Sequence, residues 1–398
     1  MSGLGQTERL GVYVSVPFCR AKCSFCNFAS GVSSPRSIAQ YVGTLCAEID
    51  ASDATAYRVG ALLPRLVDSV YFGGGTPSLL QPDQLAEIFA ALRRNFLLEP
   101  DAEITLEAAP GQIADDVLEE AMRLGVSRVS LGVQSFVDRE SAAVGRTHTG
   151  ESCVREFARL RNAGVREVGA DLIAGLPYQT RESWKASLEA ACGSDLTHLS
   201  VYLLEIDEGS RLGREVLGGG ARLHAPAVAT EELAAEMYED ACELLTANGF
   251  RQYEISNFAR GSEHQSRHNR KYWERAPYLG FGLDAHSMLL RADGSAVRFA
   301  NLDELDEHAA GRTGELTEVN DGEAFEESIF LGLRMNEGIS VASLGERFPL
   351  PWVRECEQRV VRLAREGLML VADGRWSLTT QGRLVSSEIF GELLAVAA

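Results

Sequence analysis

The chain has 398 residues, is 45% apolar and carries a formal net charge of −19. A chain of this length can bury a large core in more than one domain, and so acidic a surface repels phosphate backbones, which predicts no nucleic acid partner. It contains no apolar run of the roughly 18 to 20 residues that span a membrane. Residues 1–9 lack a secretory signal pattern, and eight cysteines are too few for a disulfide scaffold, so we expect a cytoplasmic protein.

Strand-like and helix-like segments alternate through the first half of the chain. The expected strands are apolar and rich in β-branched residues, and they cover residues 11–17, 68–74, 103–109, 127–133, 168–176 and 198–206. The helix-like segments between them include residues 114–124 and 152–163, each followed by a glycine. This alternation predicts parallel strands with right-handed crossovers. We therefore expect an α/β fold built on a partial (β/α)6 TIM-like barrel, with its site at the carboxyl ends of the strands.

The pattern changes after about residue 310, which divides the chain into predicted domains at 1–310 and 311–398. Helices are expected at 325–335, 350–366 and 381–396, after an acidic helix at 230–248 in the first domain. Two short strands flank Asp373-Gly374, a pair typical of a type I′ hairpin. Two helices followed by a hairpin predict a winged-helix-like α+β domain. The charges of residues 341–398 balance, seven Arg against seven Asp and Glu, which favours packing or docking over DNA binding.

Three cysteines, Cys19, Cys23 and Cys26, follow the first expected strand, and no fourth lies near them. A structural zinc site would need a distant fourth ligand, and a disulfide would leave one thiol over. Chance clustering of buried cysteines is disfavoured, because the residues between them include polar ones that do not follow a core pattern. Three thiolates favour a [4Fe–4S] cluster with one iron open to another ligand. The other five cysteines lie singly in helical segments, as small buried hydrophobes do.

A glycine run, residues 73–75, ends the second expected strand and is followed by Thr76. A tight turn needs one or two glycines, whereas three leave the backbone open to a ligand. A phosphate-binding loop is the competing interpretation, but no Gly-Lys-Ser/Thr follows. Polar residues near the later strand ends complete a ring, and each alone could be a surface residue or a cap: Glu107, Gln134, Arg146 and Asp171. Carboxylates can accept hydrogen bonds from ribose hydroxyls, and an arginine can pair with the carboxylate of a ligand.

These segments resemble the radical S-adenosylmethionine (SAM) superfamily, in the branch of the oxygen-independent coproporphyrinogen III oxidases and the haem chaperones called HemW. The matching stretches are VYVSVPFCRAKCSFCNF, YFGGGTPSLL, EITLEAAPG, RVSLGVQSF, VGRTHT, DLIAGLPYQT, YEISNFAR, HNRKYW and YLGFGLDAHS, with LGLR near the tail. The resemblance implies a [4Fe–4S] cluster on the three cysteines, whose open iron binds SAM. It also implies SAM contacts at Tyr13, Phe25, Gly74, Gly75, Thr76, Glu107, Gln134, Arg146 and Asp171.

Two functions compete within this branch. The oxidases decarboxylate two propionates of coproporphyrinogen III, and they carry an N-terminal extension and another cysteine directly after the cluster. This chain has about ten residues before its first expected strand, and Asn27-Phe28 after the cluster. These differences favour a haem chaperone, although Asn27 and Ala109 depart from the residues usual in that branch. The alternatives are an oxygen-independent coproporphyrinogen III dehydrogenase and, less favoured, a radical methyltransferase.

The segment HNRKYW, residues 268–273, is tied to haem binding in the chaperone branch. His268 could ligate iron, Tyr272 could stack on the macrocycle, and the neighbouring basic residues could pair with propionates. The alternative is a basic loop that packs its aromatic pair on the barrel, and His286 is a second candidate ligand. The resemblance implies haem as cargo and a haem-receiving respiratory protein at the membrane, with a homodimer as a further possibility.

Overall fold

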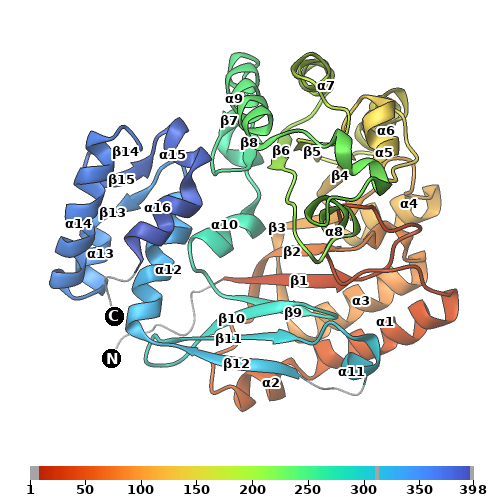
Figure 1. Cartoon of the computed structure of the whole chain (residues 1–398). Coiled ribbons are helices and arrows are strands. Elements are labelled where there is room, and N and C mark those ends of the chain that lie inside the picture. Colours follow the sequence, from red (N-terminus) through yellow and green to blue (C-terminus); the bar gives the residue numbers. More distant parts are fainter. Residues whose placement is uncertain (1–8, 310–312, 395–398) are drawn as a thin grey trace.

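The computed structural model describes residues 9–309 and 313–394. Six parallel strands form the centre of its large sheet (Figure 1). They are β1 (Leu10–Val16), β2 (Leu66–Gly74), β3 (Leu97–Ala108), β4 (Arg128–Gln134), β5 (Glu167–Ala174) and β6 (His198–Leu203). All six were expected from the sequence, and the α/β fold with a partial barrel is confirmed. Their side chains are buried on both faces, which is why the strands read as nearly continuous apolar runs.

Most of the helices of this part pack along the outer side of the curved sheet, whereas α8 (Arg211–Leu217) lies against the loop with the three cysteines, where Leu212 N–H donates to Ser24 O (2.8 Å) (Figure 1). The others are α1 (Pro35–Asp50), α2 (Ser52–Arg58), α3 (Pro82–Asn95), α4 (Asp115–Leu124), α5 (Asp138–Ala143), α6 (Gly150–Asn162), α7 (Arg181–Cys192) and α9 (Glu231–Ala247). Thr180 and Ser183 form a capping box at α7. Gly125, Gly164 and Gly249 follow α4, α6 and α9 with positive φ angles, as left-handed residues after a helix do.

The sheet is wider than the sequence predicted, because further strands extend both of its edges. β9 (Tyr278–Phe281) pairs in parallel with β1 and is followed by three antiparallel strands, β10 (His286–Leu290), β11 (Ala296–Asn301) and β12 (Thr313–Val319). At the other edge, β8 (Asn257–Ala259) and β7 (Arg251–Gln252) follow β6. α11 (Leu305–Ala309) precedes β12. The predicted domain boundary at residue 310 lies outside the described residues, and β12 continues the large sheet beyond it.

The C-terminal part has its own core around Phe325, Cys356 and Trp376. Its elements are α12 (Asp321–Arg334), β13 (Ile339–Ser340), α13 (Val341–Arg347), α14 (Leu350–Arg365), β14 (Met369–Ala372), β15 (Arg375–Leu378), α15 (Thr380–Leu384) and α16 (Ser386–Leu393). Asp373 and Gly374 both have positive φ, as a type I′ turn requires. The single last helix predicted at 381–396 was wrong: it breaks into α15 and α16 at Val385, and its predicted end lies outside the described residues.

Candidate functional site

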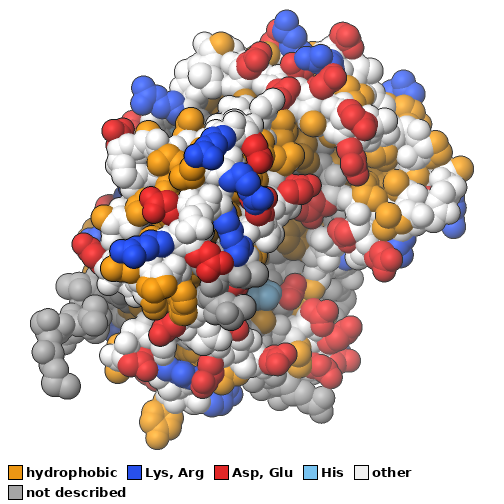
Figure 2. Space-filling model, turned by 60° about the vertical axis from the view of Figure 1, so that its left-hand side comes forward, with side chains coloured by type: hydrophobic (Ala, Val, Ile, Leu, Met, Phe, Trp, Pro, Cys, Tyr) orange, Lys and Arg blue, Asp and Glu red, His pale blue; other side chains and the backbone are white. Residues whose placement is uncertain are grey.

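A cavity of about 1140 Å³ opens at the carboxyl ends of the parallel strands. It brings together all of the residues predicted for the cluster and for SAM except Tyr13: Cys19, Cys23, Cys26, Phe25, Gly74, Gly75, Thr76, Glu107, Gln134, Arg146 and Asp171. Tyr13 is not among the lining residues; its ring stacks on Tyr71 with centroids 6.1 Å apart. Figure 2 shows one face of the molecule hollowed, with hydrophobic side chains inside the hollow and charged side chains of both signs around it.

The cysteine loop is held to the barrel by backbone hydrogen bonds. Cys19 N–H donates to Gly31 O (2.9 Å), and Ser24 N–H donates to Val144 O (3.1 Å). Thr76 Oγ1 donates to Cys19 Sγ over 3.7 Å. All three thiols are free and half-buried. Burial raises the pKa of the Cys23 thiol, and the nearby Arg146 charge opposes that rise.

The donor set on this loop suits a cluster better than a single ion. Among residues 9–309 and 313–394, no three His, Cys, Asp or Glu side chains converge on a point that could hold one metal ion. In a [4Fe–4S] cluster each thiolate binds a different iron, so the sulfur atoms do not need to converge. Three free thiols on one loop, at the mouth of a large cavity, therefore fit an iron–sulfur cluster.

The glycine run has a packing role that the sequence did not reveal. A Cβ atom on Gly75 would lie 2.7 Å from the backbone atoms Phe18 N, Phe18 O and Val16 O. Gly75 N–H donates to Val16 O (3.0 Å), and Thr76 N–H donates to Phe18 O (2.7 Å). Gly74 has a φ angle of 96°, which favours glycine. The run thus fixes the chain at the point where it leaves β1 for the cysteine loop.

Two carboxylates, Glu107 and Asp171, lie at the floor of the cavity. Tyr71 donates from its hydroxyl to Glu107 Oε1 over 2.6 Å, and Ser130 Oγ donates to Asp171 Oδ1 over 3.2 Å. Burial raises the pKa of Asp171, and it raises that of Glu107 to about 7, with the Asp171 charge adding to the rise. Both carboxyl groups are therefore hydrogen-bond acceptors in a low-dielectric site, which is typical of groups that bind hydroxyls or cations.

The raised pKa of Glu107 predicts that Glu107→Gln stabilises the protein at pH 8 but not near pH 4.5. Between these values the folded state keeps a proton that the unfolded chain has released, so stability falls as the pH rises through this window. With allowance for screening by solvent in the cavity, the gain in the free energy of unfolding is about 2 kcal/mol at pH 8. Urea denaturation at both pH values measures it.

The matched control is Glu120→Gln, on α4, where a hydrogen bond from the exposed Arg123 lowers the carboxyl pKa. This variant should not gain stability as the pH rises. An equal effect of Glu107→Gln at both pH values would show that the carboxyl carries no such proton.

Arg146 enters the cavity without a counter-charge. It forms no ion pair in the described part of the chain, and its Nε is buried without a hydrogen-bond partner. A side chain at Gly132 would collide with its guanidinium. Gln134, at the end of β4, has a φ angle of 68°, a left-handed conformation that non-glycine residues rarely adopt outside functional sites. The sequence did not identify His148, which also lines the cavity and whose Nε2 bonds Val133 O over 2.9 Å.

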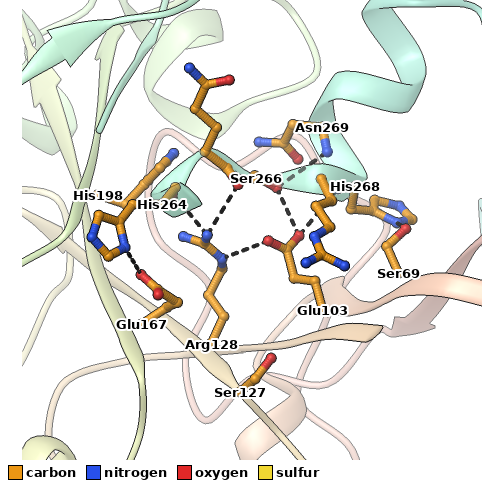
Figure 3. Close-up of polar contacts among 12 residues, drawn as sticks. Ser69, Glu103, Ser127, Arg128, Glu167, His198, His264, Ser266, His268 and Asn269 are labelled. Carbon is orange, nitrogen blue, oxygen red and sulfur yellow. Dashed lines mark hydrogen bonds and ion pairs between the residues drawn. The ribbon is translucent and has the colours of Figure 1, made fainter. Parts of the chain in front are cut away.

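HNRKYW forms a helix, α10 (Arg267–Trp273), and not the loop considered from the sequence. The helix lies against β2 and β1, with Ser69 and Glu103 of the neighbouring strands facing it (Figure 3). His268 is 1% exposed; its Nδ1 bonds Ser69 Oγ (3.2 Å) and its Nε2 bonds Tyr272 OH (2.8 Å). Burial lowers the pKa of His268 to about 3. Both ring nitrogens are therefore occupied in this conformation, and a haem contact at His268 and Tyr272 stays a prediction.

The basic residues of α10 and its flanks are all paired with carboxylates. Arg267 pairs with Asp101, Arg270 with Glu274 and Glu337, Lys271 with Asp68, and Arg275 with Glu327. The pairs of Lys271 and Arg275 are buried and those of Arg267 and Arg270 lie at the surface, but none of these residues has a free charge for propionates in this conformation. The side chain of His286 is 72% exposed, and it does not line the cavity.

Comparisons with known proteins show the family of the chain. Residues 13–191 match the radical SAM superfamily, and residues 320–385 match the HemN C-terminal domain. The chain is 31% identical over 392 residues to the haem chaperone HemW of Bacillus subtilis, covering 96% of this chain and 98% of that protein. It is 35% identical over 346 residues to the mitochondrial radical S-adenosyl methionine domain-containing protein 1 of Bos taurus, covering 84% of this chain and 75% of that protein.

One solved structure matches almost the whole fold. The coproporphyrinogen III oxidase HemN of Escherichia coli superposes with a TM-score of 0.82 over 98% of this chain and 90% of that chain, at 23% identity. This likeness shows the fold alone, with its barrel and its C-terminal domain. No helix among the described residues combines the length and the apolar character needed to cross a membrane. From the near-full-length identity to several HemW proteins, the chain belongs to the HemW-like branch of the radical SAM superfamily.

Proposed function

We propose that the protein is a haem chaperone that holds a [4Fe–4S] cluster and SAM, binds haem and delivers it to a respiratory enzyme at the membrane. The observation that carries this proposal is the identity of 30–32% to HemW proteins over nearly the whole length of both chains. We place the protein in the cytoplasm, and a homodimer is part of the same proposal. The absence of a cysteine at Asn27 supports the chaperone over the oxidase.

The cavity supports the cofactor part of the proposal. Cys19, Cys23 and Cys26 would hold the cluster, which supplies an open iron and an electron when bound. Arg146 would pair with the carboxylate of SAM, because it lines the cavity, forms no ion pair in the described part of the chain and has a buried Nε without a hydrogen-bond partner. Glu107 and Asp171 would accept hydrogen bonds from the ribose hydroxyls.

Arg146→Gln is accordingly expected to weaken SAM binding by roughly tenfold to a hundredfold, the range of a lost charge-assisted contact. Isothermal titration of the anaerobically reconstituted protein measures this. Arg155→Gln is the control, because that exposed arginine pairs only with Glu151 on α6. Equal affinities of Arg146→Gln and the wild type would remove Arg146 from the SAM site.

Haem binding is tested by adding haem to the reconstituted protein and following the Soret band. Stoichiometric binding is expected, and its absence would overturn the chaperone proposal. His268→Ala with Tyr272→Ala tests the predicted contacts. If His268 ligates the iron, the Soret maximum shifts as well as the affinity; if it only packs α10, the stability falls and the maximum of the bound form stays in place.

A second candidate, oxygen-independent coproporphyrinogen III dehydrogenase, is favoured by one observation. Residues 320–385 match the HemN C-terminal domain, which shares its name with the coproporphyrinogen III oxidase HemN. An anaerobic assay with SAM, a reductant and coproporphyrinogen III separates the candidates. Conversion to protoporphyrinogen would establish the dehydrogenase; cleavage of SAM without conversion leaves the chaperone in place.

A further inference from the structure

The cavity also has a wall that belongs to the C-terminal part of the chain. Arg334, at the end of α12, and Arg383, on α15, line it together with Leu384. Leu384 also packs against the barrel core, so this wall is fixed to the barrel. The cavity volume of 1140 Å³ exceeds the roughly 300 to 1,000 Å³ of ordinary small-molecule pockets. It therefore has room for a second ligand beside the cluster and SAM.

Arg383 is half-buried and bonds only to neutral oxygens. Its Nη1 donates to Leu378 O (3.2 Å) and its Nη2 to Thr380 Oγ1 (3.0 Å), whereas its Nε is buried without a partner. It forms no ion pair within residues 9–309 and 313–394. A guanidinium withdrawn from water without a counter-charge is unfavourable unless an anion joins it. This situation is the opposite of α10, where each basic residue is already paired.

Arg334 lines the same cavity and, unlike Arg383, already has a carboxylate partner. Its guanidinium lies 4.2 Å above the ring of Trp273, and its Nη2 donates to Glu254 Oε2 over 3.3 Å. Glu254 is fully buried, and burial raises its carboxyl pKa although Arg334 opposes the rise. Arg334 Nε, like that of Arg383, is buried without a hydrogen-bond partner. Arg334 thus presents a rigid, incompletely paired guanidinium on the same wall.

Part of the lining of the same cavity is apolar and aromatic. Tyr202 and Leu203, at the end of β6, are 42% and 40% exposed although they line the cavity, and Ile255 lies beside them in the lining. Such a surface contacts the face of a planar macrocycle, and guanidinium groups pair with carboxylates at its edge. The combination suits a flat, largely apolar ligand that carries carboxylate groups.

We propose that Arg383, with Arg334, forms a subsite for the carboxylates of the cargo tetrapyrrole, whose macrocycle lies in the cavity between the barrel and the C-terminal part of the chain. This inference rests on the proposed haem-binding function and specifies where haem binds. It places the macrocycle in a cavity that α10 does not line, so it is an alternative to the haem contacts predicted at His268 and Tyr272. The C-terminal part then contributes residues directly to cargo binding.

The experiment compares haem with its propionate dimethyl ester in titrations of the full-length, reconstituted protein. Arg383→Gln is expected to weaken haem binding by about tenfold and to leave binding of the diester unchanged, because the diester has no carboxylate to pair. The wild type should bind the diester more weakly than haem by a similar factor. Arg383→Lys keeps the charge but loses the bidentate geometry, so its affinity for haem should lie between those of the wild type and Arg383→Gln.

The matched control is Arg354→Gln, which removes the same charge from an exposed position on α14 of the same part of the chain. It should leave haem binding unchanged. If the wild type binds haem and the diester equally, or if Arg354→Gln weakens haem as much as Arg383→Gln, the subsite is overturned while the chaperone function stands. If the wild type binds neither compound, the proposed function fails, and the subsite fails with it. The diester comparison uses the wild-type protein, so it can overturn the subsite even if Arg383→Gln folds poorly.

Discussion

Cys23→Ala is expected to remove nearly all of the cluster iron and acid-labile sulfide, and with them the affinity for SAM. A four-iron cluster with only two protein thiolates on its loop has two irons without protein ligands and does not persist. Cys23 is the middle thiol, anchored through Ser24 N–H to Val144 O and close to the Arg146 charge. Iron and sulfide analysis after anaerobic reconstitution, with the visible absorption of the cluster, measures the loss.

Cys46→Ala is the matched control for this prediction. Cys46 is a buried thiol on α1, and burial raises its pKa to about 11, so it stays neutral and is a poor ligand. Its replacement should cost some core packing and leave the iron and sulfide content unchanged. Full cluster content in Cys23→Ala would show that the loop does not supply the ligands, whereas loss in both variants would point to misfolding.

The barrel was predictable because its signal is local. Each of the six central strands is a short β-branched run, and the helices between them end at a glycine whose positive φ the structure confirms at Gly125 and Gly164. The hairpin at Asp373-Gly374 was predictable for the same reason. The strands at the edge of the sheet were harder to predict. β7 and β8 are two and three residues long, and they are held by pairing, β8 with β6 and β7 with β8, which leaves no periodic pattern in the sequence.

The residues that line the cavity were also predictable, because parallel strands deliver their carboxyl ends to one edge. The sequence did not identify the residues that arrive from elsewhere. Arg334 and Arg383 are separated from the cysteine loop by more than half of the chain and reach the cavity only through packing of the C-terminal part. Likewise, the pattern HNRKYW reads as a free basic cluster, whereas folding pairs Lys271 with Asp68 and buries His268.

The buried ion pair below α10 leads to the second large prediction: Arg128→Met should lower the free energy of unfolding by about 3–5 kcal/mol. Arg128 Nε lies 3.1 Å from Glu103 Oε2, and both side chains are over 90% buried. Glu103 also accepts from His268 N–H over 3.1 Å, and Arg128 Nη2 donates to His264 O over 2.8 Å (Figure 3). Removing the arginine leaves the Glu103 carboxylate buried without its charge partner. Urea denaturation of the reconstituted protein measures the loss.

Arg123→Met is the control, because Arg123 pairs with Glu120 on the exposed surface of α4 and should contribute less than about 1 kcal/mol. The double variant Arg128→Met with Glu103→Gln should recover part of the loss, since no unpaired buried charge remains. Amide hydrogen exchange should become faster in α10 of Arg128→Met, because this pair anchors the start of the helix, and stay unchanged in α4. Equal costs for Arg128→Met and Arg123→Met would mean that the buried pair does not hold α10. HNRKYW could then open toward haem at little cost in free energy. That result would favour propionate binding at the basic residues of α10 over binding at Arg383.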